Sequence, residues 1–272
     1  MPPVKTVHFT RWSEFVAHTD LLEGWAFRGQ LKVDWPLVST LTRRLREFCP
    51  DPHLWPLREA RAMRVFRRKA HIHLRDRTTL GDELRCLALM QHHGAATRLL
   101  DFTKSPFVAA FFALESARHD VAVFALNTPA LWKRVPSFDP TLDRDRIDPR
   151  LPGNFEHFYA VNRFPVLWFG EPAEMDARLM AQSGLFVVPG VLHESLDTIL
   201  ENYGPSDDLL HKVVLSADMR SEAMHALYRM NLTYANLFPD LDGLARSLHY
   251  ELESIWPSLV EEYERTSQTP PV

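Results

Sequence analysis

Polar side chains interrupt an otherwise apolar run that reads LALMQHHGAATRLLDFTKSPFVAAFFAL, from Leu87 to Leu114. Polar groups are costly to bury unless they are paired, so these residues need a structural or a chemical reason. Structurally, Arg98 and Asp101 could form an ion pair that pins a turn. Chemically, a guanidinium and a carboxylate at the ends of two elements could face a ligand in a cleft. The sequence is compatible with both interpretations for the set His92, His93, Thr97, Arg98 and Asp101.

The composition is that of an ordinary globular protein. With 272 residues, 46% of them hydrophobic and 24% charged, the chain can bury a sizeable core as one large domain or two small ones. No apolar run is long enough for a membrane span and the first residues lack a secretory signal, so a cytoplasmic location is predicted. The two cysteines, Cys49 and Cys86, form no C-x-x-C motif and are predicted to be reduced and buried.

The charge is unevenly distributed along the chain. The net charge of −4 argues against a protein that simply coats nucleic acid, but Thr42 to Arg77 holds eleven Lys or Arg against four Asp or Glu. A helix is predicted over residues 56–74, and four of its arginines recur at helical spacing. This face is either a solvated surface or a binding surface for a phosphate-bearing partner such as a nucleic acid. The four are Arg58, Arg61, Arg64 and Arg68.

Short strands and helices must position these residues, and they alternate without an internal repeat. Residues 129–153 have no period and predict a long surface loop or flap. The mixture lacks the regular alternation of a doubly wound fold, so an α+β fold is predicted. Strands are predicted at 23–29, 121–126, 164–169, 185–188 and 211–215, and further helices at 82–92, from 103 or 105 to about 115, and at 195–203, 218–230 and 241–255.

Several familiar chemistries are excluded by their missing motifs. The chain has no G-x-G pair, no P-loop, no G-x-S-x-G elbow and no H-E-x-x-H zinc helix. His71 and His73 would point to different sides of a helix, and Cys86 with His92 and His93 is no standard ligand set. No metal is therefore expected.

The segment Phe27-Arg28-Gly29-Gln30 resembles the signature that gives the FRG domain its name. Further blocks of that family follow in order over about Glu23 to Leu248. The resemblance implies a single FRG domain over residues 23–256, with an N-terminal extension (1–22) and a C-terminal tail (257–272). The later blocks are Pro36-Leu37 with Arg43, the run from Leu87 to Leu114, Arg178 with Gln182-Ser183-Gly184-Leu185-Phe186, and the stretch from Leu237 to Ala245.

The FRG domain is similar in layout to ADP-ribosyltransferase-type toxins, which implies short strands in a split sheet flanked by helices. In such enzymes an arginine on an early strand contacts NAD, and an acidic residue on a later element supports cleavage of the bond to nicotinamide. The resemblance therefore implies a bacterial toxin or phage-defence effector that uses NAD as substrate and modifies nucleic acid or protein. An antitoxin or regulatory protein would be a further partner.

These implied roles fall on particular residues. Arg28 would hold the pyrophosphate of NAD, Gly29 would leave room for a close ligand, and Gln30 is predicted to contact NAD as well. Cleavage develops positive charge on the ribose, so a carboxylate must face it, and Asp101 is the favoured one. Arg98 would orient that carboxylate or bind phosphate. Asp240 and Asp242 are rivals to Asp101, although Asp240 also suits a helix N-cap.

Four further residues complete the predicted site. Gln182 stands where such transferases present their catalytic element, but a glutamine carries no charge, so the standard glutamate mechanism is in doubt. His92 or His93 would stack on nicotinamide or move a proton, unless it only caps a helix carboxyl end. Thr97 is a further predicted contact to NAD.

Two other functions compete with the transferase. A non-catalytic module that senses nucleotide or nucleic acid would use the same arginines without Asp101. A hydrolase acting directly on nucleic acid ranks last, because no metal-binding carboxylate cluster is evident. The predicted site depends on one geometric condition, that the guanidinium groups of Arg28 and Arg98 meet in one pocket.

Overall fold

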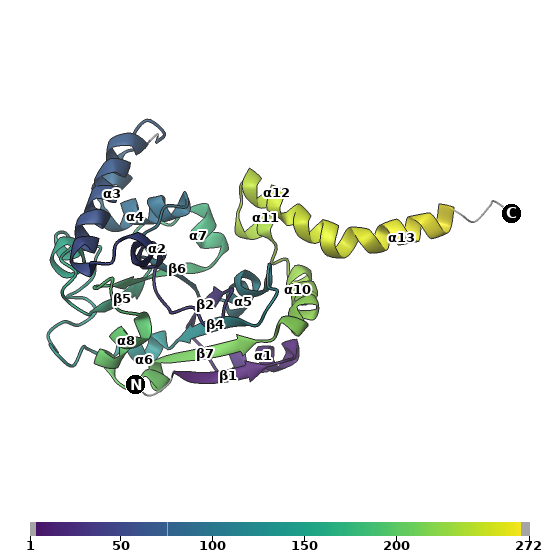
Figure 1. Ribbon diagram of the computed structural model, residues 1–272, viewed down its shortest axis with the longest axis horizontal. Helices are drawn as coiled ribbons and strands as arrows, with labels where there is room; N and C mark the ends of the chain where they lie inside the picture. The colour runs from purple at the N-terminus through teal and green to yellow at the C-terminus, as the bar shows by residue number, and fades with distance from the viewer. Residues whose placement is uncertain (1–3, 75, 268–272) are drawn as a thin grey trace.

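The computed structural model describes residues 4–74 and 76–267. Its seven strands form one mixed sheet in the order β1-β7-β4-β2-β3-β6-β5, flanked by helices (Figure 1). Strands β1 and β7 are parallel, and all the other neighbours are antiparallel. The mixed fold class predicted from the sequence is confirmed. The strands are β1 (Lys5–Phe9), β2 (Ala26–Gln30), β3 (Leu100–Thr103), β4 (Val121–Leu126), β5 (Leu167–Gly170), β6 (Gly184–Pro189) and β7 (Leu210–Leu215).

The helices begin where the sequence places polar caps. Asp82 accepts a hydrogen bond from the Arg85 amide at the start of α4, and Ser105 does the same for the Val108 amide of α5. The helices are α1 (Trp12–Thr19), α2 (Thr40–Phe48), α3 (Trp55–Ala70), α4 (Glu83–His92), α5 (Pro106–Leu114), α6 (Thr128–Trp132), α7 (Ala177–Ala181), α8 (Leu196–Leu200), α9 (Ser206–Leu209), α10 (Arg220–Arg229), α11 (Tyr234–Leu237), α12 (Leu241–Tyr250) and α13 (Trp256–Ser267).

Three segments differ from the sequence-based expectation. Residues 1–22 were predicted to precede the domain, yet β1 pairs with β7 along its whole length and so belongs to the sheet. Residues 257–267 of the predicted tail continue α13. Of the loop predicted at 129–153, residues 129–132 belong to α6 and the rest has no helix or strand, but Leu142 and Ile147 are buried, so this segment is packed against the body.

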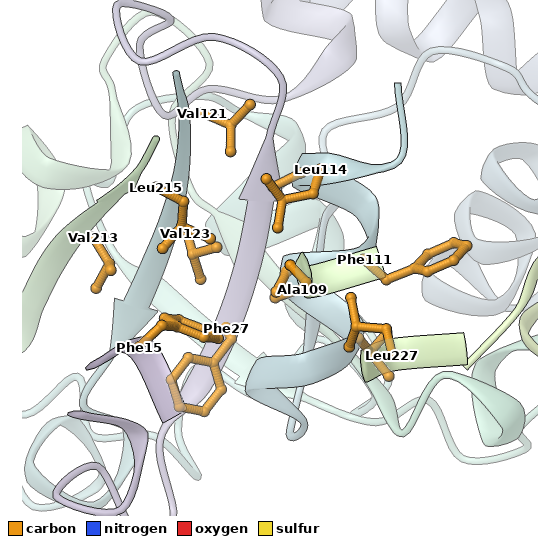
Figure 2. Packing of buried hydrophobic residues seen from close by; sticks show 14 of the residues in the cluster. Phe15, Phe27, Ala109, Phe111, Leu114, Val121, Val123, Val213, Leu215 and Leu227 are labelled. Carbon is orange, nitrogen blue, oxygen red and sulfur yellow. The ribbon is translucent and has the colours of Figure 1, made fainter. Parts of the chain in front are cut away.

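The largest apolar cluster lies between the sheet and α1, α5 and α10. Figure 2 shows Val121 and Val123 of β4 beside Val213 and Leu215 of β7, with Leu114 of α5 close by. Helix α5 is apolar nearly all round, and most of its residues are fully buried, as its sequence predicts. This helix fixes the position of β2, the strand that carries the Phe-Arg-Gly motif.

Gly29 is required because α5 packs directly against β2. A Cβ placed there would lie 2.1 Å from the Ala109 carbonyl oxygen and 2.8 Å from the Ala113 nitrogen, closer than any real Cβ. The glycine was predicted to leave room for a ligand. The structure gives another reason, since the room is taken by the backbone of α5.

The sheet opens between β2 and β3. These strands are in register at a single pair, Phe27 with Thr103, whereas β2 and β4 are paired along all five residues of β2. Beyond that pair, Arg28 of β2 has no pairing partner on β3, and Asp101 of β3 has none on β2. The opening brings the two residues to the edge of the same gap.

Two further features bear on the expected setting of the protein. Cys49 and Cys86 are buried free thiols that form no disulfide. Among the helices of residues 4–74 and 76–267, none has the length and apolarity that crossing a bilayer requires.

Candidate functional site

A cleft lies beside the opening between β2 and β3. It consists of two adjoining cavities of about 220 and 140 Å³, which share Asp101, Arg178 and Gln182 in their walls. Strand β2 and α5 wall the smaller cavity, while α4 and α7 wall the larger one. The smaller cavity adds Arg28, Gly29 and Phe112, and the larger adds Arg85, Gln91, His92, Glu174 and Asp176.

Arg28 spans the opening in the sheet. Its Nη1 donates a hydrogen bond of 2.7 Å to the Asp101 carbonyl oxygen, and its Nε is buried without a partner among the described residues. Burial lowers the pKa of the Arg28 guanidinium, the Asp101 carboxylate raises it, and the charge of Arg43 lowers it again. An arginine nevertheless stays protonated at neutral pH. Arg28 is therefore a cation with unused donor capacity next to a second cation.

That second cation, Arg43, lies on α2. Its guanidinium carbon is 5.2 Å from the centre of the Trp35 ring, and the Lys32 Nζ is 5.6 Å from the same centre. Burial also lowers the pKa of Arg43. Like charges held close together and partly desolvated repel each other, and a bound anion relieves that repulsion. The Arg28 end of the cleft is thus suited to an anionic group.

Asp101 is the exposed residue of an otherwise buried strand. Its Oδ1 accepts a 2.6 Å hydrogen bond from Gln91 Nε2, and Gln91 Oε1 in turn accepts from Thr97 Oγ1. Among the described residues only Oδ1 is engaged in this way, so the carboxylate is oriented while one oxygen stays available. Thr97 itself is buried and acts through Gln91. Thr97 lines neither cavity of the cleft, so its predicted contact to NAD gains no support from the structure.

His92 and Arg178 form the far wall of the cleft. His92 Nδ1 lies 2.8 Å from Asp176 Oδ2, and this hydrogen bond lowers the pKa of Asp176. Arg178 Nη1 donates to the His92 carbonyl oxygen at 3.2 Å, and its guanidinium carbon is 4.4 Å from the centre of the Phe238 ring. The imidazole of His92 is therefore held in one orientation in the wall of the cleft.

His93 lies at the C-cap of α4 and lines a groove on another side of that helix. The alternative that a histidine only ends its helix describes His93, whereas His92 faces the cleft. One histidine of the pair is thus removed from the predicted site.

Gln182 connects three elements around the cleft. Its side-chain Nε2 donates to the Leu237 carbonyl oxygen at 2.9 Å. Its main-chain carbonyl oxygen accepts a hydrogen bond from Thr103 Oγ1 at 2.6 Å. One N–H donor of the side-chain amide is thus engaged in holding α11. Gln30 is buried, and its amide nitrogen and oxygen have no partner among the described residues, but it lines neither cavity of the cleft.

Arg98 lies in the core and faces no ligand. Its side chain is 0% exposed, and its Nε donates to Glu59 Oε1 at 2.8 Å while Nη2 pairs with the other oxygen of Glu59. Nη1 donates to the carbonyl oxygens of Tyr159 and Pro189 at 2.8 and 3.1 Å. The predictions that Arg98 meets Arg28 in one pocket, and that it pairs with Asp101, are wrong because Glu59 of α3 holds this guanidinium.

The rival carboxylates also lie elsewhere. Asp240 accepts a 2.7 Å hydrogen bond from the Gly243 amide and caps α12, which is its alternative role. Asp242 is exposed on the same helix, and neither residue lines the cleft. Of the three candidate carboxylates, only Asp101 lines the cleft.

Sequence reasoning overlooked Glu59, Gln91 and Asp176. A signal existed for Glu59, which is the only acidic residue in the basic segment 56–74 and lies one turn before the buried Met63. Gln91 adjoins the histidine pair and could have been included with it. Asp176 had no comparable signal. No group of three or more possible metal ligands occurs among the described residues.

Comparison with known proteins gives one match. Residues 23–121 match the family model of the FRG domain. That segment contains β2 and β3, and so includes Arg28 and Asp101, whereas Arg178 and Gln182 lie after it. No curated protein and no solved structure was found to match the chain.

Proposed function

We propose that the cleft around Arg28 binds NAD and transfers ADP-ribose from it. The premise is that this chain is a member of the FRG family, whose domain model matches residues 23–121. One observation carries the proposal. A cation without a described salt-bridge partner and an oriented carboxylate, Arg28 and Asp101, lie at the same opening in the sheet. An enzyme that cleaves NAD needs both charges, the first for the phosphates and the second for the ribose.

The phosphates would bind at Arg28 and Arg43. A planar guanidinium matches two phosphate oxygens at once, and charge-assisted hydrogen bonds are stronger than neutral ones. Binding of a doubly charged pyrophosphate would offset the repulsion between these two arginines. The Trp35 ring beside Arg43 would hold that side chain in place.

Asp101 would act on the ribose. As the bond between ribose C1′ and the nicotinamide nitrogen breaks, the bonding electrons leave with nicotinamide and positive charge grows on the ribose. A carboxylate fixed beside C1′ stabilises that charge more in the transition state than in bound NAD. Gln91 would keep the carboxylate of Asp101 in its productive orientation.

His92 would accept the proton. A nucleophile of the acceptor, on nucleic acid or protein, forms the new bond to C1′ and loses its proton in the same step. His92 is the imidazole in the wall of the cleft, and Asp176 fixes which ring nitrogen is engaged. The products are ADP-ribosylated acceptor, nicotinamide and a proton.

A non-catalytic sensor of nucleotides is the second candidate. Gln182, at the position where related transferases present their catalytic element, spends its amide donor on Leu237. A cleft that binds NAD or ADP-ribose without turnover would still need Arg28 and Arg43, but it would not need Asp101.

Release of nicotinamide from NAD by the purified protein tests the proposal. The wild type and the exposed-surface control Arg118→Ala should release nicotinamide in the presence of acceptor nucleic acid or protein. Arg28→Ala and Asp101→Asn should abolish release while their thermal unfolding midpoints stay close to that of the wild type. If the wild type binds NAD but neither it nor any variant releases nicotinamide, the result favours the sensor. Cleavage of nucleic acid in the absence of NAD contradicts both candidates.

A further inference from the structure

A long apolar groove lies between α2, α3 and α4. It encloses about 1070 Å³, and Leu89 of α4 lines both this groove and the cleft. Phe48 and Val65 in its walls are 58% and 38% exposed, so the groove leaves large apolar side chains in water. A contiguous apolar patch of this kind marks an interaction surface. Its apolar lining includes Leu41, Leu45, Phe48, Val65, Phe66 and Met90.

The rim of the groove is basic. Arg44, Arg58, Arg61 and Lys69 line it, and the guanidinium carbon of Arg58 is 5.7 Å from the centre of the Phe48 ring. Arg44 is paired with Glu47 at 3.4 Å on the exposed surface, an arrangement that contributes little. An occupant with apolar side chains on one face and carboxylates beside them would match both the lining and the rim.

The C-terminal arm, residues 241–267, has that pattern. Helix α12, the π-helical turn Glu251–Ile255 and α13 follow one another without a break, and Figure 1 shows this run projecting away from the body. Large apolar side chains recur along it every three or four residues, with exposed fractions between 43% and 78%. Such a stripe on a helix needs a partner. It comprises Leu241, Leu244, Leu248, Leu252, Trp256, Leu259, Val260 and Tyr263.

The outer part of the arm is acidic. Glu261, Glu262 and Glu264 outnumber Arg265 in α13. The inner part is attached to the body, because Arg220 pairs with Glu253 and Tyr228 donates a 2.7 Å hydrogen bond to Glu251. The direction of the projecting stripe is therefore largely set before any partner binds, which reduces the entropy lost on docking.

We propose that the C-terminal arm of one copy of this chain docks in the α2–α3–α4 groove of a second copy. In Figure 1 the arm projects from the side of the body opposite α3, so it points away from the groove of its own chain. Reciprocal exchange of two arms closes a symmetric dimer. The leucine and aromatic side chains of α13 fill the groove, as amphipathic helices do in other helix-in-groove complexes.

Charge and lining together favour a helix over nucleic acid as occupant. The arm carries three glutamates opposite Arg58, Arg61 and Lys69, so attraction across the rim sets its orientation. A nucleic acid would use the basic rim but would leave the aliphatic side chain of Val65, which is 38% exposed, uncovered, because bases stack on aromatic rings. Arg58 and Arg61 belong to the α3 face that the sequence left open between a solvated surface and a surface for a phosphate-bearing partner, and here they are assigned to the acidic arm. This proposal is independent of the function of the cleft.

Sedimentation equilibrium of the full chain over a wide range of concentration tests the proposal. The wild type should be a dimer. Leu259→Glu with Tyr263→Glu in the arm, and Val65→Glu in the groove, should each weaken dimerisation at least about tenfold, as expected when a charge enters an apolar interface. Leu21→Glu changes a leucine that is 76% exposed and lies outside both surfaces, and it should leave the dimer unchanged.

A charge exchange separates docking from loss of folding. Arg61→Glu with Lys69→Glu should be monomeric, and so should Glu261→Lys with Glu262→Lys. A mixture of these two proteins should form heterodimers, because each arm then meets a groove of opposite charge. A monomeric wild type at all concentrations, or a mixture that stays monomeric, would overturn the proposal. Oligonucleotide binding by a monomeric wild type that is lost in Arg61→Glu with Lys69→Glu would also overturn it.

Discussion

Two arginines of the predicted site, Arg28 and Arg98, lie in opposite surroundings. Arg98 is sealed in the core, where Glu59 and two carbonyl oxygens use its donors. Arg28 lies at the edge of a cleft, with one hydrogen bond to a carbonyl oxygen and a second guanidinium nearby. The first arrangement satisfies the charge within the protein, and the second leaves capacity for a ligand.

Arg28 and Arg98 show that two arginines of one predicted site can have different roles. A buried ion pair with all its hydrogen bonds made is a structural connection, here between α3 and the segment that leads into β3. A cation that is partly buried and not neutralised is unfavourable unless something binds it. Residue type alone does not separate the two cases, because both are arginines in family blocks.

The largest expected effect is on the core pair. Arg98→Met leaves Glu59 buried and uncompensated and should lower the free energy of unfolding by about 3–5 kcal/mol. Arg67→Met, which breaks the partly exposed pair with Glu83 between α3 and α4, should lower it by about 1 kcal/mol or less. Urea unfolding measures both.

The double variant Arg98→Met with Glu59→Met sharpens this result. Removing both charges should restore much of the stability that the single variant loses, because no unpaired carboxylate remains in the core. Losses that simply add would mean that the pair is not coupled, and the structural role assigned to Arg98 would fail.

The next effect concerns the carboxylate of the cleft. Asp101→Asn keeps the size of the side chain and removes its charge, so nicotinamide release should fall on the order of a hundredfold or more. Asp242→Asn, on α12, should leave the rate unchanged. Equal rates for Asp101→Asn and the wild type would exclude Asp101 from the chemistry.

Gly29→Ala tests the packing that positions Arg28. The added methyl group meets the Ala109 carbonyl oxygen, so β2 and α5 must separate, with a loss of about 1–3 kcal/mol of stability. The displacement should also weaken ligand binding at Arg28. A stable variant with full binding would show that α5 does not fix this strand.

The smallest expected effect is the pH dependence at Asp176. Its pKa in the folded protein lies below the ordinary value of 3.8, so the stabilisation is present above pH 3.8 and is lost as the pH falls below it. Asp176→Asn keeps the helix cap and removes the charge, so it should destabilise by about 1 kcal/mol or less at neutral pH. Unfolding curves of the two proteins should converge in acid, and a difference that grows there would contradict the sign.

Much of the fold could be predicted from local patterns. The strand at 121–126 was predicted with its observed bounds, and the cap residues Asp82 and Ser105 start α4 and α5 as expected. Strand β3 was overlooked because it has four residues with an exposed aspartate among them, too short for a clear alternation. Strand β1 was assigned to an extension because its pairing with β7 joins opposite ends of the chain.

The site was predictable in part, for a physical reason. The motif identified Arg28 and Asp101, 73 residues apart, and the structure joins them by a hydrogen bond. It could not identify the partner of Arg98, because Glu59 lies on another helix and its burial depends on how α3 packs. Local sequence shows that a charge will need a partner, and only the tertiary fold decides which partner it receives.

The most direct test of the difference between the two arginines is calorimetric titration of NAD and of ADP-ribose into the wild type, Arg28→Lys, Arg28→Ala and Arg118→Ala. The account predicts binding by the wild type and Arg118→Ala, and binding at least about tenfold weaker for both Arg28 variants at an unchanged unfolding midpoint. Equal affinities in all four proteins, or no binding by the wild type, would contradict it.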